Sequence, residues 1–511
     1  MVTATTMLLL GVFSVDLDVG AGQTYTTIGD AIDAAQAGDV IRVHPGTYAE
    51  DLDLGGGTEG NPIRIEAVEP LMATLQGVID IGGTDWEIAG LTIETPDGPD
   101  GIQISGDRIL LEGLDMSGGT RDGIDGGGVD VTVRQSTIHL YDAGDSDAHC
   151  IVLNPGAENW VIEDNELFDC SGDGVQLFSS GAERTIINTT IQRNIIYYTG
   201  AISRTENAID VKNADGLYIR ENLMYGFGDN KTLVFQKGPA NIEVTCNEMN
   251  DGFTGVEFRG EDGGVVENVL FAHNLMVGFE QYALKFDEVV GADVHNNTFV
   301  DIDGDGLRFE EESLQGGSVR NNLWVNATQV ENDGDFEFEA NGFWNVDDNQ
   351  IGSASDVTDD PMLDADYRLM GGSPLVDAGV DVGLEFAGEA PDIGWDEVDG
   401  NPCAAPPDPG DDGGDDSDSG ADETGGDDAG DGMDDGGDGG SGGPSGGGDD
   451  GGGDGGGDDG GTGGPGDGTS DDGGAADDDA DGCSCRSSSR HGGWALGLLL
   501  LGFVRRRRLT L

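Results

Sequence analysis

Short segments that alternate apolar and polar residues recur between residues 100 and 310. Each consists of a small residue followed by an apolar, a variable and an apolar residue, which is the pattern of a short strand with one buried face. Successive segments lie 22 to 34 residues apart, and a period of this size predicts a solenoid of stacked coils. The first apolar residues of these segments are Ile102, Ile124, Ile151, Val175, Ile209, Leu233, Val256, Leu284 and Leu307.

An asparagine with the same period follows a second apolar segment in most coils. Asparagine tolerates left-handed backbone and suits a tight bend, and asparagines stacked coil on coil can form an amide ladder. Two strands and one bend per repeat, with no helical periodicity between them, predict a parallel β-helix. The leucine pattern of a leucine-rich repeat and the four strands of a propeller blade are missing. The bend positions are Leu91, Leu114, Ser136, Asn165, Asn194, Asn222, Asn247, Asn274, Asn297 and Asn322.

Composition separates a folded part from a linker. Residues 401–482 are almost only Gly, Asp, Ser, Pro and Ala, which predicts a disordered acidic linker after a folded domain at residues 16–400. The net charge of the chain is −78, and the first 400 residues contribute −58 of it. This charge excludes nucleic acid as a partner and disfavours a polyanion unless a divalent cation bridges the two. The alternative is that the negative charge only keeps the protein soluble, through repulsion between its molecules.

The N-terminus and two cysteines bear on the cellular compartment. Met7–Val15 is an apolar run that predicts either the core of a signal segment at residues 1–15 or a buried first strand, although no Lys or Arg precedes Arg42. We favour export. Cys150 and Cys170 lie 20 residues apart, close to one coil, so they form either a disulfide in an oxidising compartment or two buried thiols.

The last segment, residues 483–511, combines a cysteine motif, a short apolar run and an arginine cluster. The run Gly492–Val504 is 13 residues long, shorter than the ~20 that a membrane helix needs, and four arginines follow it. This order resembles the myxobacterial C-terminal surface-sorting tail. The resemblance implies processing at Cys483 or Cys485 and a place at the cell surface or outer membrane, or release outside the cell. The alternative is a weak membrane anchor with the same topology.

Residues near the start of the folded part predict a short helix. Thr26 or Thr27 can cap it, and Ile28, Ala31 and Ile32 lie on one apolar stripe. The first coil of a solenoid exposes its core unless something covers it, and this helix is well placed to do so.

Both ends of the folded part resemble a known family. The entry segment YTTIGDAIDAAQAGDVIRVHPGTYAEDL looks like that of the pectate-lyase-like right-handed parallel β-helix superfamily, and Asp360–Leu363, Ser373–Gly379 and Asp392–Gly394 look like its exit segment. The resemblance covers about Val19 to Glu397. It implies an all-β, right-handed parallel β-helix with a short N-terminal capping helix. The superfamily contains lyases, hydrolases, epimerases and non-catalytic binding proteins, so the resemblance does not fix the activity.

The variable residues of the repeated strands should face away from the core. Adjacent coils lie about 4.8 Å apart, so Glu257 should neighbour Lys285, and Arg259 should neighbour Asp287. One interpretation is a ladder of surface ion pairs, each worth about 0–1 kcal/mol. The other is a polysaccharide-binding track, on which Gln176, Glu257 and Asp287 contact the substrate.

Resemblance to the polysaccharide lyases of this fold implies a Lys or Arg base, and carboxylates that hold calcium as a cofactor. Such a base acts beside a substrate carboxylate and needs a lowered pKa. Lys212 is the first candidate, because Asp210 lies two residues away on the same face. Asp173 and Arg259 on nearby coils could join them, and Lys285 is the second candidate base. The sequence contains no complete lyase motif.

One acidic segment matches a calcium-binding pattern. Asp301-Ile302-Asp303-Gly304-Asp305-Gly306, with Glu312, satisfies the EF-hand loop, but an EF-hand needs a helix on each side, and a strand is expected here. The alternative is a loop that binds Ca²⁺ weakly through Asp301, Asp303 and Asp305. The six histidines show no pair at metal-ligand spacing on one strand.

Two functions therefore stay open. The first is a surface protein that binds or cleaves polysaccharide, as a lyase or a glycoside hydrolase-like enzyme, with a cleft over Asp210 and Lys212. The second is a non-catalytic display or adhesion protein, with the charges of the ladder fully paired and no cleft. In both, the tail would contact the cell envelope or membrane.

Overall fold

The protein is described from a computed structural model. The structure describes residues 14–403 except 180, 182, 261, 262, 311–313, 333, 334 and 399. Most of the expected signal segment, the linker after residue 403, and the tail with Cys483 and Cys485 lie outside the described residues. No helix among the described residues is long and apolar enough to cross a membrane.

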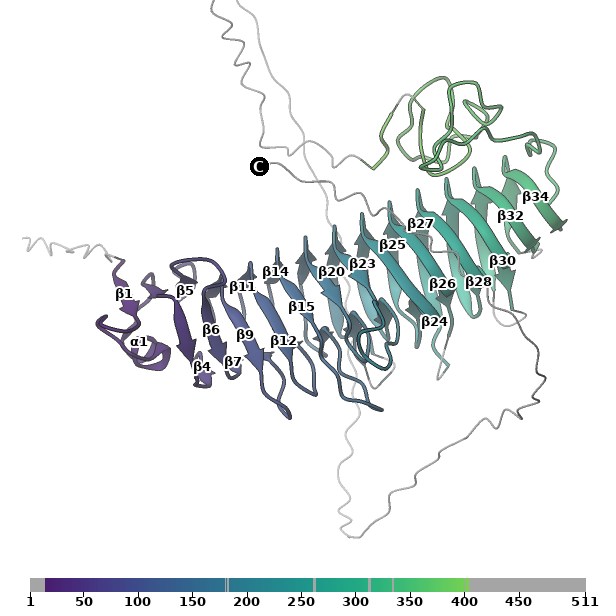
Figure 1. The fold of residues 1–511 in the computed structure, drawn as a ribbon. Helices are drawn as coiled ribbons and strands as arrows, with labels where there is room; N and C mark the ends of the chain where they lie inside the picture. Colours follow the sequence, from purple (N-terminus) through teal and green to yellow (C-terminus); the bar gives the residue numbers. More distant parts are fainter. Residues whose placement is uncertain are drawn as a thin grey trace, which may run out of the picture. The chain divides into compact units, whose positions relative to one another are not determined.

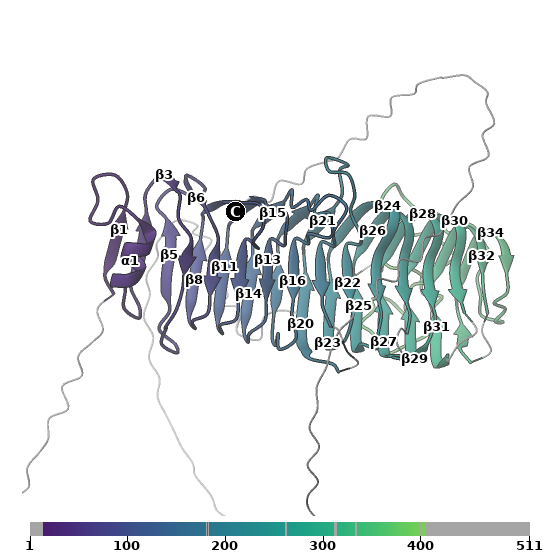
Figure 2. The same cartoon turned by 90° about the horizontal axis from the view of Figure 1, so that it is seen from below.

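The described chain winds into a stack of coils whose strands pair in parallel (Figures 1 and 2). One sheet of 14 strands forms the first wall of the stack. Its strands are β1 (Asp16–Val19), β2 (Val40–Val43), β5 (Ile63–Ala67), β8 (Trp86–Ala89), β11 (Ile109–Glu112), β14 (Val131–Arg134), β17 (Val161–Glu163), β20 (Ile186–Gln192), β23 (Ala214–Arg220), β25 (Ala240–Thr245), β27 (Val266–Ala272), β29 (Val289–His295), β31 (Gln315–Arg320) and β33 (Glu337–Glu339).

The remaining 20 strands begin as two rows that later merge. The middle row is β3 (Gly46–Tyr48), β6 (Ala73–Gln76), β9 (Thr92–Thr95), β12 (Asp115–Gly118), β15 (Thr137–His139), β18 (Glu166–Phe168) and β21 (Ile195–Tyr197). The site row is β4 (Leu52–Asp53), β7 (Ile79–Ile81), β10 (Ile102–Ile104), β13 (Ile124–Gly126), β16 (Ile151–Leu153), β19 (Val175–Leu177) and β22 (Ile209–Val211). Both rows continue through β24 (Leu223–Phe235), β26 (Glu248–Phe258), β28 (Leu275–Phe286), β30 (Thr298–Phe309), β32 (Leu323–Val330) and β34 (Gly342–Asn349), and the C-terminal halves of these strands extend the site row.

The expectation of two strands per repeat is therefore wrong for the first half of the stack, where each coil has three. In the second half, buried residues such as Phe227, Phe279 and Ile302 lie between the middle-row part and the site-row part of each long strand, and they keep the chain against the core. In the first half, glycine-rich and polar loops separate the same two segments. The chain leaves the stack at these loops, so the strand is interrupted.

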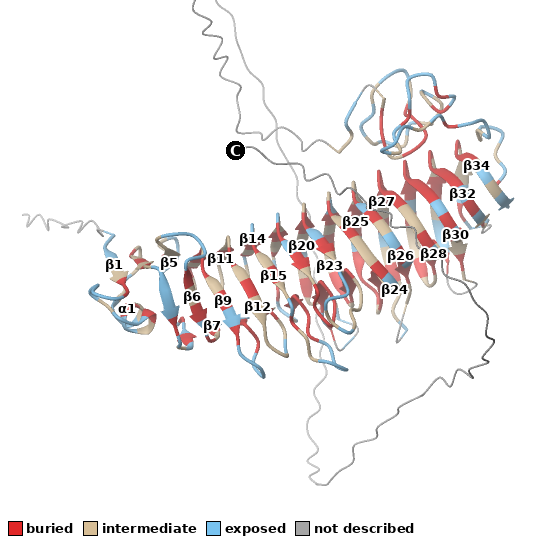
Figure 3. Ribbon diagram, in the orientation of Figure 1, coloured by how far each residue is buried: buried red, intermediate tan, exposed pale blue. Residues whose placement is uncertain are grey.

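The strand register confirms the repeat that the sequence indicates. Ile102 pairs with Ile124, Ile151 with Val175, and Val256 with Leu284, and each stacks on its neighbour in the core. Figure 3 shows the resulting alternation of buried and less buried positions along the strands. The prediction of an all-β parallel β-helix is confirmed.

The amide ladder is also confirmed and continues to Asn341. In each step the side-chain Nδ2 and backbone N–H of one asparagine both donate to Oδ1 of the next, as between Asn222 and Asn247, at 3.0 Å each. Ser136 begins the ladder and Asp356 ends it. The left-handed residue is the one before each asparagine, for example Cys246 at φ 59°, so the asparagine itself serves hydrogen bonding rather than the bend.

The predicted capping helix is α1 (Ile28–Ala34), with Thr27 as its N-cap. Thr27 Oγ1 accepts a hydrogen bond from the Asp30 N–H at 3.2 Å. Ile28 and Ala31 are fully buried in the core beside the first strands. The helix covers the open core of the first coil, as expected.

The exit segment, residues 357–398, packs against the outer face of the last coils. Leu375 and Ile393 from this segment join Val300 and Val325 in a small second core. A disulfide between Cys246 and Cys403 ties its end to an earlier coil, a contact that the sequence did not indicate. Cys150 and Cys170 form the other disulfide, which decides between the two interpretations of this pair.

Asn247→Ala should destabilise the protein strongly. The substitution removes the acceptor of the Asn222 N–H and side chain, and it leaves the Ile219 carbonyl without its side-chain donor. Buried polar groups that lose their partners cost about 1–3 kcal/mol each, so we expect a loss of about 2–4 kcal/mol in urea unfolding followed by circular dichroism. Asn250→Ala is the control, because Asn250 is partly exposed and its side chain donates to exposed Glu248. Equal losses for both variants would contradict the role of the ladder.

Candidate functional site

Asp210 lies at the centre of the site row, at the variable position of β22. This residue is only 3 % exposed. Lys212 Nζ lies 3.3 Å from Asp210 Oδ2, and Gln236 Nε2 from the next coil donates to Oδ1 at 2.6 Å. The predicted pairing of Asp210 with Lys212 is thus observed, although this carboxylate is buried rather than displayed on an open face.

Burial raises the pKa of Asp210 to about 6, and the negative charge of Asp173 adds to the effect. The charge of Lys212 and the hydrogen bonds from Gln236 and Lys212 oppose this rise. A carboxyl group with such a pKa exchanges its proton close to neutral pH, as a general acid or base requires.

Asp173 lies one coil before Asp210 and is completely buried. The N–H and side-chain amide of Asn207 donate to Asp173 Oδ1 at 2.9 and 2.8 Å. Gln176 Nε2 donates to Oδ2 at 3.0 Å. Gln176, predicted as a substrate contact, therefore orients a neighbouring carboxylate.

His149 completes this group, and the sequence analysis did not single it out for chemistry. Its Nδ1 lies 2.8 Å from the Asp173 N–H and 3.3 Å from Asp173 Oδ2. The two contacts require opposite protonation of Nδ1. The shorter contact involves an obligate backbone donor, so we assign the neutral ring with its proton on Nε2.

Glu257 forms a second centre two coils further along the site row. Lys285 Nζ lies 3.0 Å from Glu257 Oε1, and Lys231 Nζ and Arg259 lie 3.3 and 4.0 Å from Oε2. Burial acts to raise the pKa of Glu257, but the charge of Lys231 and the hydrogen bond and charge of Lys285 outweigh it and lower that pKa. The predicted neighbours Glu257 and Lys285 are confirmed by the register.

Arg259 connects the two centres. One of its terminal nitrogens donates to Gln236 Oε1 at 3.2 Å, and Gln236 in turn holds Asp210. Asp287 directly follows β28. Its N–H donates to the Phe258 carbonyl, so the parallel register continues by one residue and Asp287 stands opposite Arg259. The predicted catalytic and substrate-binding residues thus lie on five consecutive coils of one row.

The three aspartates predicted to bind metal do not gather in this way. Asp301, Asp303 and Asp305 lie on β30, where alternate residues are about 7 Å apart. Asp301 accepts from the Asn326 side chain at 2.6 Å, and Asp305 lies 3.7 Å from Arg308. The segment is a strand, in agreement with our rejection of the EF-hand.

A different acidic group is compact enough for one ion. Asp100, Asp122 and Asp125 offer carboxylate oxygens that all lie within 4.8 Å of one another. Burial raises the pKa of Asp125, and the charges of Asp100 and Asp122 add to it. Arg121 Nε lies 3.0 Å from Asp100 and already pairs with it. The phrase Asp-Gly-Ile, which occurs at Asp100 and again at Asp122, was the sequence signal for this group.

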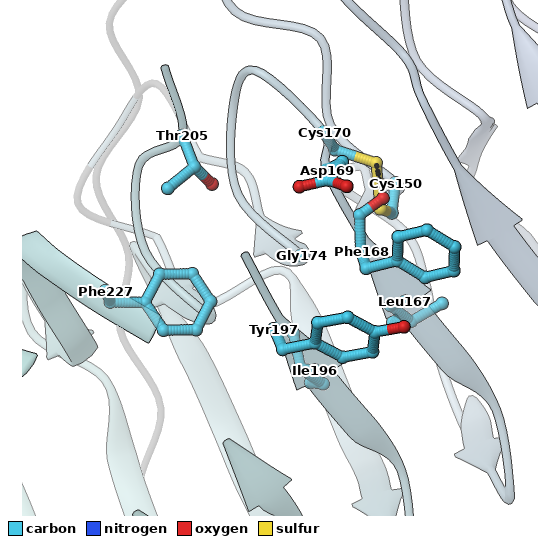
Figure 4. Close-up of a pocket in the computed structure, with 10 residues that line it drawn as sticks. All are labelled: Cys150, Leu167, Phe168, Asp169, Cys170, Gly174, Ile196, Tyr197, Thr205 and Phe227. Carbon is cyan, nitrogen blue, oxygen red and sulfur yellow. Dashed lines mark hydrogen bonds between the residues drawn. A yellow bond between two sulfur atoms is a disulfide. The ribbon is translucent and has the colours of Figure 1, made fainter. Parts of the chain in front are cut away.

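Two of the hollows along the described coils lie close to these residues. The first is lined by Phe168, Tyr197, Phe227 and the Cys150–Cys170 disulfide, and Figure 4 shows the Phe168 and Tyr197 rings on one side of it and Phe227 on the other. It has no room for a water molecule. The second is a depression of about 530 Å³ over Asp80, Gln103 and Asp125. The cleft expected over Asp210 and Lys212 stays a prediction.

The geometry described so far defines a parallel β-solenoid with a polar row along one wall. The family model described as right handed beta helix region matches residues 77–203 and 185–351, more than half of the chain. The protein belongs to this right-handed β-helix family.

Individual relatives are more distant. A Bacillus subtilis (strain 168) protein named "Uncharacterized protein YwoF" is 24% identical over 369 residues, which cover 61% of this chain and 74% of the relative. The PL6 family polysaccharide lyase Pedsa3628 from Pseudopedobacter saltans superposes with a TM-score of 0.51 at 11% identity, over 70% of this chain and 96% of the lyase. Pectate lyase Pel9A gives a TM-score of 0.41 at 17% identity, over 76% and 97%. The similarity to Pedsa3628 shows a shared fold and nothing more.

The raised pKa of Asp210 predicts a pH-dependent effect of Asp210→Asn. The folded protein binds a proton there more tightly than the unfolded chain, whose aspartates titrate near 3.8. Wild-type stability should therefore fall as the pH rises from about 4 to about 6, because the buried group must ionise. The variant should escape this loss.

The free energy of unfolding of Asp210→Asn, measured relative to wild type, should rise by about 2–3 kcal/mol from pH 4 to pH 8, since one pKa unit corresponds to about 1.4 kcal/mol. Denaturant unfolding at both pH values measures it. Asp53→Asn, which removes an exposed carboxylate of the same row, should show no such change. A difference in unfolding free energy between the variant and wild type that is the same at both pH values would contradict the raised pKa of Asp210.

Proposed function

We propose that this protein binds an acidic polysaccharide along the site row and acts on it at Asp210 and Lys212. The observation that carries the proposal is the buried carboxyl group of Asp210, whose Oδ2 lies 3.3 Å from Lys212 Nζ on the outer wall of the solenoid. Burial also raises the pKa of Asp210 to about 6. A structural ion pair needs no such pKa, whereas proton transfer to a substrate does.

The distribution of positive charge supports an acidic ligand. The chain contains four lysines, Lys212, Lys231, Lys237 and Lys285, and all of them lie within four coils. The first 400 residues carry a net charge of −58, and these lysines offset part of that charge locally. Polysaccharide is also the substrate class in the name of the Pseudopedobacter lyase, and we extend that class to this chain.

In the lyase form of the proposal, Lys212 takes the proton from carbon 5 of a uronate. The electron pair of that bond forms a double bond between carbons 4 and 5, and the glycosidic oxygen leaves carbon 4 with a proton from Asp210. Arg259 and Lys285 would pair with sugar carboxylates on neighbouring coils. In a hydrolase form, Asp173 and Asp210 would be the two carboxyl groups that glycosidases use.

Calcium belongs to the proposal as a bridging cation. Oxygen ligands such as those of Asp100, Asp122 and Asp125 suit Ca²⁺, and their mutual repulsion favours a bound cation. The pairing of Asp100 with Arg121 competes with it. Weak binding through Asp301, Asp303 and Asp305 stays a prediction.

A second function, display or adhesion without catalysis, is favoured by one observation. The charges of the later coils form ion pairs with one another, as Arg308 does with Glu331 at 2.7 Å and Lys285 with Glu257 at 3.0 Å. Such pairs stabilise a rod without any ligand. A rod of this kind would bind glycans without cleaving them.

We also propose that the protein is exported and held at the cell envelope. The Cys150–Cys170 and Cys246–Cys403 disulfides support an oxidising compartment. The tail after residue 482, with its cysteines and arginine cluster, would provide attachment or a processing site at Cys483 or Cys485.

The test is to incubate the full-length protein with a panel of uronic-acid polysaccharides, with and without Ca²⁺. Ultraviolet absorbance reports the unsaturated product of a lyase, and a reducing-end assay reports hydrolysis. We expect turnover that falls at least about 100-fold in Lys212→Ala, because a general base typically contributes 10²–10⁴-fold. Arg193→Ala is the control, since Arg193 pairs with Glu163 on the first sheet, away from the site row.

Retained activity in Lys212→Ala would remove Lys212 as the base. Binding without any turnover across the panel would favour the display function, and the absence of both binding and turnover would reject a polysaccharide ligand from that panel.

A further inference from the structure

The depression over the early coils is separate from the centre at Asp210. Its volume is about 530 Å³, within the range of about 300–1,000 Å³ that is usual for ligand sites. Its floor and walls come from the site row and from the turns that follow it. They are Asp80, Gln103, Ile104, Ser105, Asp125, Gly127, Gly128, Asn154 and Pro155.

The side chains around this depression are mainly hydrogen-bond acceptors. Asp80 and Asp125 contribute carboxylates, Gln103 and Asn154 contribute amides, and the lining contains neither Lys nor Arg. The buried carboxylate of Asp100 lies beside Asp125, and Arg121 pairs with it at 3.0 Å. A sugar carboxylate would be repelled here, whereas hydroxyl and ammonium groups can donate to these oxygens.

The floor of the depression is bare backbone at Gly127. A Cβ atom added there would meet the Pro155 carbonyl at 3.9 Å, which is ordinary contact, so the space above it is open. The neighbouring Gly126 is different, because its Cβ would lie 2.8 Å from the Trp160 ring. Gly127 thus leaves room for a flat ring, and a large side chain at this position would fill the room without entering the core.

We propose that this depression is a subsite for a sugar unit that carries a free amino group and no carboxylate. Asp80 pairs with the ammonium group, and Gln103 and Asn154 bind ring hydroxyls. The proposal rests on the polysaccharide function proposed above and extends it to a specific kind of sugar.

The two ends of the site row then select different units. The early coils present carboxylates. The later coils present Lys231, Arg259 and Lys285 around Glu257, and Lys285 also lies 3.7 Å from Glu310. A chain that contains both amino sugars and uronates would bind in one direction only. A pure polyuronate would use the later coils alone.

The test uses a glucosamine tetrasaccharide and its fully N-acetylated counterpart as probes, with binding to the full-length protein measured by calorimetry. Acetylation removes the positive charge, so the acetylated probe should bind at least tenfold more weakly. Gly127→Trp fills the depression and should weaken glucosamine binding at least tenfold. Because it changes no charge, it separates the subsite from general attraction of a cation to an acidic protein.

Two further variants complete the design. Gly371→Trp places the same side chain where an added Cβ meets nothing within 4 Å, and it should bind like wild type. Asp80→Asn should weaken the glucosamine probe more than the acetylated one. Equal affinity for both probes, or unchanged affinity in Gly127→Trp, would overturn the subsite.

A uronate oligosaccharide measured on the same proteins separates this proposal from the general one. Its binding should be unaffected by Gly127→Trp. If the uronate binds and glucosamine does not, the subsite is wrong and the proposed function stands. If glucosamine binds at the depression and no uronate binds anywhere, the acidic-polysaccharide function is wrong and the subsite stands.

Discussion

The buried amide ladder is the constraint on which the arrangement of the coils depends. From Asn194 to Asn341, each side chain accepts two hydrogen bonds from the coil before it, one from backbone and one from side chain. A coil that slipped by one residue would lose both bonds and would turn its apolar residues outward. The ladder therefore fixes the register of every later coil, and with it the alignment of polar side chains along the outer wall.

That alignment explains why the site row is buried at its centre. Long polar side chains from adjacent coils lie about 4.8 Å apart, so they reach one another and cover the shorter carboxylates between them. Gln236 lies against Asp210 in this way, and Lys231 and Lys285 lie against Glu257. Stacking thus turns an exposed position of a single strand into a shielded one.

The sequence predicted those parts of the structure that repeat. Periodicity located the strands, the amide ladder and the neighbours Glu257 and Lys285, because a parallel stack converts a fixed spacing into direct contact. It did not predict the merging of two strands at β24 or the pairing of Cys246 with Cys403, since both depend on loops that follow no repeat. His149 and the group around Asp122 were missed for a related reason. His149 and Asp122 each lie just before a strand, where side-chain direction does not follow the alternation.

The disulfide between Cys246 and Cys403 has a mechanical consequence. A pulling force on the chain beyond residue 403 would reach the solenoid at Cys246, next to the ladder residue Asn247, rather than at the last coil. The exit segment would therefore carry none of that load. A tether placed in this way pulls on the side of the stack, where many parallel hydrogen bonds share the force, and it spares the terminal coil, which could otherwise unravel strand by strand.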